Sequence, residues 1–176
     1  LYPDGAEDQK FWVSQARNAF MAFTLYLFEK YDDDQKIGFP FSKPPTIGAI
    51  YRLASGDGKQ ELKPFLKDLA QRPFLSSHAK TAFAGMLSQA DETFASILGT
   101  FKEPLNAWIN PILDAVTSAD DFRLDDVRKK KMTIYIGIQP NKLAESRLII
   151  NLFFSQLINL NTKELPQNNK ELKHQC

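Results

Sequence analysis

The segment Ser55-Gly-Asp-Gly-Lys59 is the part of the sequence that comes closest to a phosphate-binding loop. Such a loop follows the pattern G-x-x-x-x-G-K-[ST], because consecutive backbone N–H groups must surround a phosphate at the start of a helix. Here only one residue separates Gly56 from Gly58, and Gln60 follows the lysine. We therefore interpret the segment as a helix end followed by a turn, and not as a nucleotide site.

Acidic, histidine and cysteine residues are too dispersed to indicate catalysis or metal binding. The acidic groups at 32–34 and 120–126 do not follow the D-x-D-x-D-G spacing of a calcium loop. His78 is expected at a helix start, as a surface or capping residue, and His174 lies close to the single cysteine, Cys176. One cysteine excludes an internal disulfide framework. The sequence predicts no catalytic, cofactor-binding or metal-binding residue in this chain.

The densest basic set lies in the middle of the chain and comprises Lys59, Lys63, Lys67, Arg72 and Lys80. Because acidic residues alternate with these cations, the plainer interpretation is a solvated face of mixed charge. The functional interpretation is a weak contact with single-stranded DNA or with an acidic protein. A second basic run, at 128–131, is expected to pair with the aspartates before it, although a contact with a phosphate backbone is the alternative.

Composition excludes several classes of protein. The chain has 176 residues, of which 43% are hydrophobic and 24% charged, as in ordinary globular proteins. The formal net charge of +1 gives no general attraction to nucleic acids. The longest apolar run, Ala19 to Phe28, is far shorter than the roughly 20 residues of a membrane span. The first residue is Leu1 and not Met, so we expect the chain to be part of a longer protein.

Apolar spacing predicts helices at 8–31, 47–54, 60–71, 76–98 and 104–109. The first is apolar nearly all round, which is typical of a helix buried on several sides. Thr46 is the expected cap of the second helix, and Asp32 to Asp34 are expected just beyond the end of the first. Phe39 and Phe41 lie in a proline-rich linker, where they are either tether residues or apolar anchors.

The last third of the chain changes character. Met132 to Ile138 is β-branched and apolar on both faces, which is typical of a buried parallel strand, and a helix is expected at 143–160. Such a strand needs neighbours that this chain does not supply. We therefore predict a mainly α fold: a helical bundle inserted in an α/β domain and cut out with flanking helices and one strand of it.

Several blocks of sequence resemble a known family. The resemblance covers both flanks, about 80 residues, and rests on the order and spacing of the blocks. These blocks are Phe11-Trp-Val-Ser-Gln-Ala-Arg-Asn18, Asp121-Phe122, the basic stretch to Lys131, Thr133 to Ile138, Pro140-Asn-Lys-Leu143 and the helix to Leu160. In these blocks the chain is similar to type IV secretion coupling proteins, the TraG/TraD family of conjugation ATPases.

The resemblance implies a hexameric, inner-membrane-anchored ATPase with a RecA-like nucleotide-binding domain. Its all-alpha domain is inserted between the phosphate loop and the magnesium-binding strand and faces the cytoplasm. On this basis 1–36 is one flank of the nucleotide-binding domain, 37–129 the helical insertion and 130–176 the return flank. The sites for ATP and magnesium then lie outside this chain, which is itself no enzyme and makes no membrane contact.

The family's all-alpha domain receives substrates, either a relaxase with attached single-stranded DNA or protein effectors, sometimes through an adaptor. The basic set defined above is then the candidate contact surface. Two alternatives stay open. The helices could transmit nucleotide state in another RecA-like hexameric motor, or the chain could be a stand-alone helical protein-binding domain, in which case 132–138 would not form a strand.

Overall fold

The computed structural model describes residues 7–162, apart from the side chains of residues 8 and 145. Contacts divide the chain into two compact units, residues 1–118 and 119–176. His174, Cys176 and most of the polar C-terminal segment lie outside the described residues. The mainly helical fold predicted from the sequence is confirmed, whereas its insertion in a RecA-like domain stays a prediction.

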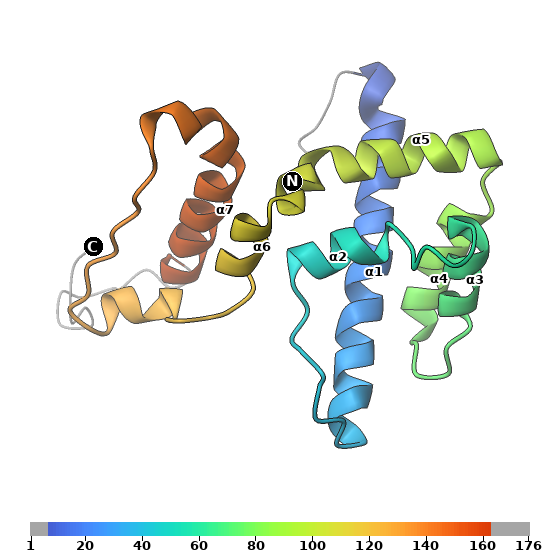
Figure 1. The fold of residues 1–176 in the computed structure, drawn as a ribbon, viewed down its shortest axis with the longest axis horizontal. Helices are drawn as coiled ribbons and strands as arrows, with labels where there is room; N and C mark the ends of the chain where they lie inside the picture. Colours follow the sequence, from blue (N-terminus) through green and yellow to red (C-terminus); the bar gives the residue numbers. More distant parts are fainter. Residues whose placement is uncertain (1–6, 163–176) are drawn as a thin grey trace. The chain divides into compact units, whose positions relative to one another are not determined.

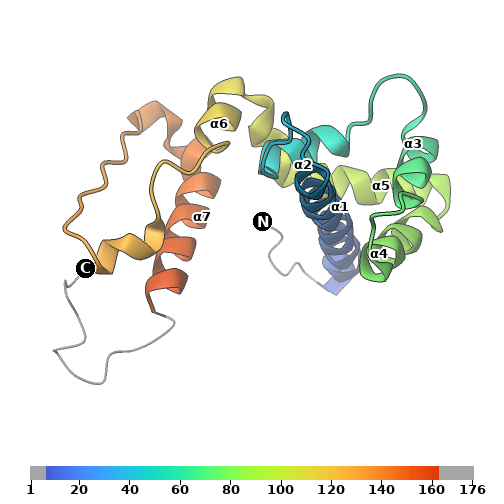
Figure 2. The same ribbon diagram turned by 90° about the horizontal axis from the view of Figure 1, so that it is seen from below.

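The first unit consists of short helices packed around one long helix. Its elements in order are η1 (Glu7–Gln9), α1 (Lys10–Lys36), α2 (Ile47–Leu53), α3 (Leu62–Ala70), α4 (Ser77–Leu87), α5 (Asp91–Lys102), η2 (Glu103–Ile109) and α6 (Pro111–Val116). Figures 1 and 2 show α1 at the centre, with α2, α4 and α5 against it. The sequence prediction omitted α6, although Asn110 caps it by accepting a hydrogen bond from the Ile112 N–H.

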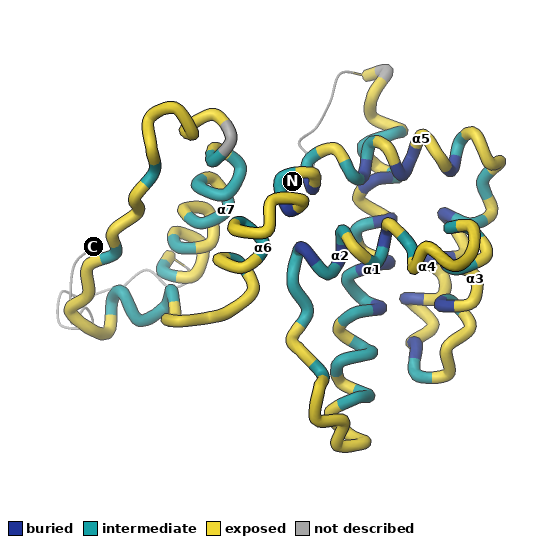
Figure 3. Tube along the Cα trace, in the orientation of Figure 1, coloured by how far each residue is buried: buried dark blue, intermediate teal, exposed yellow. Residues whose placement is uncertain are grey.

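One face of α1 forms the centre of the hydrophobic core. Ala16, Ala19 and Ala22 are fully buried there, and their small side chains let α4 and α5 approach closely. Phe23 follows on the same face, with its ring 5.9 Å from that of Phe83 and 5.1 Å from that of Phe101. Figure 3 shows the buried positions gathered where these helices meet. The prediction that this helix is buried on several sides is wrong, because its buried residues share this one face while Phe11, Met21 and Phe28 stay about half exposed.

Side-chain caps also fix where two other helices begin. Thr46 Oγ1 accepts a hydrogen bond from the Ala49 N–H at 3.1 Å, as the sequence predicted. Ser76 caps α4 in the same way through Ala79. The Glu29 carboxylate also accepts hydrogen bonds from Ser76 N–H and Oγ, both at 2.6 Å, so α1 holds the start of α4.

Two predicted helix boundaries are wrong. Asp32 to Asp34 belong to α1, because Asp34 accepts a hydrogen bond from Lys30 one turn earlier at 2.5 Å and the helix runs on to Lys36. The helix predicted over 76–98 is two helices, α4 and α5. The chain turns at 88–90, where the Lys63 ammonium donates a hydrogen bond to the Gln89 carbonyl oxygen at 2.7 Å.

The second unit contains η3 (Leu124–Arg128), η4 (Pro140–Lys142) and α7 (Leu143–Asn161). The predicted C-terminal helix is confirmed, but the strand predicted at 132–138 is not formed. These residues are extended without a paired neighbour in the described part of the chain, and Tyr135 is 90% exposed. A strand is defined by its pairing, so an apolar β-branched segment without a partner remains a loop (Figure 1).

Burial differs between the two units. Every buried residue among those described lies in the first unit. Apolar side chains of α7, including Phe154, Ile158 and Leu160, stay exposed. The described part of the second unit therefore has no core comparable to that around α1. The assignment of 1–36, 37–129 and 130–176 to domains of a larger protein stays a prediction.

Candidate functional site

The five predicted site residues belong to α3, α4 and the loops beside them. Lys59 lies in the loop before α3, Lys63 and Lys67 lie on α3 one turn apart, Arg72 follows α3, and Lys80 lies on α4. All of them are exposed except Lys63. We call this set the α3–α4 basic face.

Lys63 has a structural role within this face. Its ammonium donates hydrogen bonds to Asp91 Oδ1 at 2.6 Å and to the Gln89 carbonyl at 2.7 Å, and it lies 5.4 Å from the centre of the Phe94 ring. Its side chain is only 21% exposed. Because these contacts use two of its three N–H donors, Lys63 joins α3 to the start of α5 and has one donor left to offer a ligand.

Asp91 neutralises part of the positive charge of α3. The hydrogen bond from Lys63 is the main reason that the pKa of Asp91 lies below its ordinary value, and the charges of Lys63 and Lys67 lower it further. The structure thus brings Lys63, Lys67 and Asp91 together. In the described part of the chain, Lys59, Lys67, Arg72 and Lys80 form no ion pair, so these four cations remain for a partner.

Lys63→Met is expected to lower the free energy of unfolding by about 1–2 kcal/mol, because it removes a charged hydrogen bond to a part-buried carbonyl and a cation–π contact. The matched variant Lys67→Met, one turn further along α3, should change it by less than about 0.5 kcal/mol. Urea denaturation of both variants checks the difference. Equal losses would contradict the structural role of Lys63.

A cleft that the sequence did not reveal lies at the C-terminal end of α1. This α1 cleft has a volume of about 490 Å³, and its lining includes Tyr31, Phe39, Phe41, Lys43, Arg52 and Asp114. The linker 37–46 forms one wall, and residues of α2 and of the α6 region complete it. The sequence signal that could have indicated it is the Phe-Pro-Phe segment followed closely by Lys43.

Two carboxylates hold the walls of the α1 cleft in place. Asp34 accepts hydrogen bonds from Lys30 at 2.5 Å and from Ser42 Oγ at 3.0 Å, which fastens the linker to α1. The hydrogen bond from Lys30 is the main cause that lowers the pKa of Asp34. Asp114 pairs with Arg52 of α2 at 2.5 Å. Gly48 permits this contact, because a Cβ there would lie 1.8 Å from Asp114 Oδ1.

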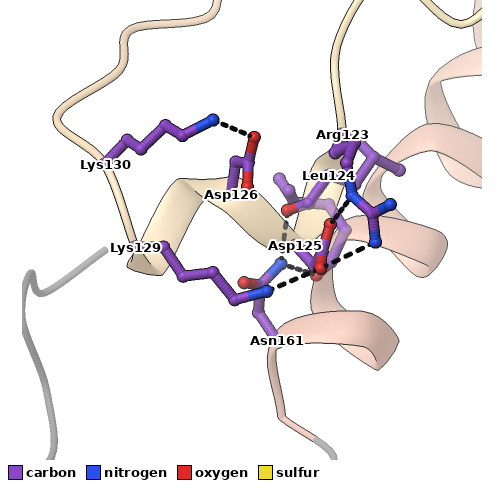
Figure 4. A network of polar contacts seen from close by, with 8 residues as sticks. Arg123, Leu124, Asp125, Asp126, Lys129, Lys130 and Asn161 are labelled. Atoms are coloured by element: carbon purple, nitrogen blue, oxygen red, sulfur yellow. Dashed lines mark hydrogen bonds and ion pairs between the residues drawn. The ribbon is translucent and has the colours of Figure 1, made fainter.

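Ion pairs in the second unit involve two members of the basic run at 128–131, Lys129 and Lys130. Asp125 accepts hydrogen bonds from Arg123 Nε at 3.0 Å and from Lys129 at 2.7 Å, and Lys130 pairs with Asp126 at 2.7 Å (Figure 4). The hydrogen bond from Arg123 is the main reason that the pKa of Asp125 lies far below its ordinary value. The predicted pairing with the preceding aspartates is confirmed for Lys129 and Lys130.

Asn161 ties the end of α7 to η3. Its side-chain amide donates a hydrogen bond to the carbonyl oxygen of Leu124 at 2.9 Å (Figure 4). It donates a second one to the carbonyl oxygen of Leu157 at 2.8 Å. Arg128 donates to the backbone carbonyl of Asn161. These contacts, together with the ion pairs above, explain the polar residues of 123–130 as structural.

Comparison with known protein families gives a match over nearly the whole chain. The model of the family described as "Type IV secretory system Conjugative DNA transfer" matches residues 2–176. The chain belongs to this family. The resemblance to type IV coupling proteins that the sequence indicated is thereby confirmed, and it extends beyond the two flanks to the helical middle.

Relatives of this type IV family member are proteins named VirD4. The chain is 34% identical to the protein from Rhizobium radiobacter over 158 residues, which cover 88% of this chain and 20% of the relative. It is 30% identical to the one from Agrobacterium fabrum (strain C58) over 93% of this chain and 22% of that relative. The chain thus spans about a fifth of the length of these relatives. No solved structure matches it.

The described residues show neither a metal site nor a membrane-spanning helix. In residues 7–162, apart from the two undescribed side chains, no group of three or more His, Cys, Asp or Glu residues could hold a metal ion. No helix of this part is long and apolar enough to cross a membrane. The expectation that ATP and magnesium bind elsewhere in the whole coupling protein stays a prediction.

Proposed function

We propose that the helical part of this chain is the substrate-recognition domain of a type IV coupling ATPase. It recruits either a relaxase with its attached single-stranded DNA or a protein effector to the secretion channel, directly or through an adaptor. Membership of the conjugative DNA transfer family across residues 2–176 carries the proposal. Coupling in such a system requires a surface that recognises cargo, separate from the ATP site of the motor.

The geometry of the first unit supports this role. Its core around α1 makes a rigid helical scaffold, and Lys59, Lys67, Arg72 and Lys80 stand on its surface without ion-pair partners in the described part of the chain. Exposed, unpaired cations on a fixed scaffold attract acidic proteins or phosphate backbones and set the orientation of the encounter. Lys63 belongs to the scaffold that holds them.

The whole protein is proposed to be a homo-hexameric ATPase that acts at the cytoplasmic side of the bacterial inner membrane. On this proposal its ATP and magnesium sites lie outside this chain. Two features support a larger RecA-like domain around this chain. Its further strands would pair with the unpaired segment 132–138, and they would cover the exposed apolar residues of α7.

A stand-alone helical protein-binding domain is the second candidate. It is favoured by one observation, that residues 132–138 form no strand in the described part of the chain. It is disfavoured by the exposed apolar side chains of α7, which a self-contained domain would bury.

An NMR titration of the full 176-residue chain tests the recruitment proposal. We expect a relaxase C-terminal segment, or an acidic effector segment, to shift resonances within 59–80 at physiological salt. Reversing Lys59, Lys67 and Lys80 to Glu should weaken binding at least about tenfold, because each exposed charge of the patch contributes to the attraction.

The matched control is Lys131→Glu, which reverses an exposed lysine of the second unit and should leave binding unchanged. The recruitment proposal is wrong if none of the cargo segments binds the chain. The α3–α4 basic face is not the binding site if the variant with all three lysines changed to Glu binds as tightly as the unchanged protein.

A further inference from the structure

We propose that the α1 cleft holds single-stranded DNA, with a base stacked on Phe41 and a phosphate against Lys43. The inference rests on the proposed function and deepens it, because it separates the place where the nucleic acid is held from the α3–α4 basic face. The cleft volume of about 490 Å³ falls in the range of roughly 300–1,000 Å³ that is usual for ligand sites.

The first argument is an exposed aromatic surface on a linker that is hydrogen-bonded to α1. Phe41 is 80% exposed and Phe39 48%, and their rings stand edge to face at 6.0 Å. Pro40 between them restricts the backbone, and Ser42 is hydrogen-bonded to Asp34 of α1. An exposed ring on such a linker is a stacking platform for a base, since every base has a π-face.

The second argument is the sign of the available charge. Three cations and two carboxylates line the cleft. Both carboxylates are already engaged, Asp34 by Lys30 and Asp114 by Arg52. Lys43 is exposed and forms no ion pair in the described part of the chain. The charge left for a ligand is therefore positive, which favours an anion and disfavours a basic peptide.

The third argument combines both features. An exposed ring and an unpaired cation in the same cleft match the alternation of base and phosphate along a single strand. An acidic peptide would satisfy Lys43 but would leave the exposed face of Phe41 without a specific partner. The α3–α4 basic face has the cations without such a ring, because the one aromatic ring under Lys63, that of Phe94, is buried.

Fluorescence anisotropy with a labelled ten-nucleotide oligo-dT and the full 176-residue chain tests the inference. Phe41→Ala should weaken binding roughly tenfold, the usual loss for one stacked base. Lys43→Gln should reduce the slope of log K against log salt by about 0.7, the change for one phosphate contact to a single strand. Phe41→Leu keeps the apolar bulk but removes the ring, and should resemble Phe41→Ala.

Matched controls lie in the second unit: Tyr135→Ala removes an even more exposed ring, and Lys131→Gln removes an exposed lysine. Both should bind as the unchanged chain does. Circular dichroism melting of every variant shows that it is folded; the linker position of Phe41 and Lys43 leaves the core around α1 intact.

Several outcomes would overturn the inference. These are no binding of oligo-dT by the unchanged chain, full binding by Phe41→Leu, or a loss that appears only with Lys67→Gln and Lys80→Gln. If a Glu-rich peptide displaces the oligonucleotide and its binding depends on Lys43 but not on Phe41, the cleft binds an acidic protein segment and not DNA. If the relaxase segment still binds while oligo-dT does not, this inference fails and the proposed function stands. If neither the relaxase segment nor oligo-dT binds, both the inference and the proposed function are wrong.

Discussion

Phe23→Ala is expected to lower the free energy of unfolding by about 4 kcal/mol, the usual cost of removing a large ring from a tightly packed core. Phe23 is fully buried on α1, and its ring contacts those of Phe83 and Phe101. The cavity would open where α1, α4 and α5 meet, so the surrounding helices could close it only by moving together. A loss of this size is a large fraction of the roughly 5–15 kcal/mol that stabilises a typical domain.

Phe28→Ala is the matched control for this variant. Phe28 lies on the same helix but about half exposed, so its removal should cost less than about 1 kcal/mol. Urea denaturation followed by the fluorescence of Trp12 and Trp108, both in the first unit, measures the two changes. Similar values for both variants would mean that the face of α1 around Phe23 is not the core of this unit.

The result also bears on the position of α1 in the whole protein. The sequence prediction places residues 1–36 in a flank of the nucleotide-binding domain. In the structure, α1 forms the core of the first unit with α4 and α5. A large loss on Phe23→Ala would mean that the helical unit depends on α1 for its stability, even if α1 also contacts a nucleotide-binding domain in the longer protein.

Local sequence signals were sufficient for most helices but not for the break between α4 and α5. Residues 76–98 keep an unbroken apolar spacing without glycine at the break or proline anywhere. The chain turns there because Lys63, from another helix, binds the Gln89 carbonyl and Asp91. Such a contact across 26 residues has no signature in a local pattern. The acidic pair Asp91 and Glu92 is the one available hint of a new helix start.

The end of α1 was misplaced for a related reason. Three aspartates near a helix C-terminus oppose its dipole, so the rule places them outside. In the structure Asp34 is hydrogen-bonded to both Lys30 and Ser42, and these contacts offset the unfavourable position. Ser42 belongs to the linker, whose path no pattern within α1 predicts.

The strand at 132–138 shows the opposite limit. Its apolar, β-branched composition predicted a buried strand, but pairing depends on segments distant in sequence. Periodicity reports what a segment favours and not whether its partners are present. The same holds for the apolar residues of α7, which remain exposed in the described part of the chain.

The sequence predicted which basic residues form the candidate site, but it did not show which of them have a structural role and which are available to a partner. Sequence spacing placed Lys63 and Lys67 side by side on a helix, yet one is tied to Asp91 and Gln89 whereas the other is exposed. The α1 cleft was beyond prediction, because it needs Arg52 to meet Asp114, 62 residues further along the chain. Only the tertiary structure brings that pair to the linker.

Trp108 is expected to have the second largest effect on stability, because it holds the α6 region that lines the cleft. Its ring is buried in η2, and its Nε1–H donates a hydrogen bond to Thr117 Oγ1 at 2.8 Å. Thr117 in turn donates to the Leu113 carbonyl of α6 at 2.8 Å. We expect Trp108→Ala to cost about 3–4 kcal/mol, and Thr117→Val, which removes the acceptor but keeps the ring buried, about 1 kcal/mol.

Hydrogen exchange distinguishes the two variants, because Thr117→Val should affect α6 alone and Trp108→Ala should affect several helices. Thr117→Val should speed exchange of α6 amides, such as the one of Asp114 that bonds to the Asn110 carbonyl, and leave α1 protected. Trp108→Ala should speed exchange in α6 and also in α2 and α5, since η2 packs against all three helices. If α6 kept its protection in Trp108→Ala, the wall of the cleft would be held by the Arg52–Asp114 pair alone. Binding of oligo-dT would then depend on that pair and not on the indole.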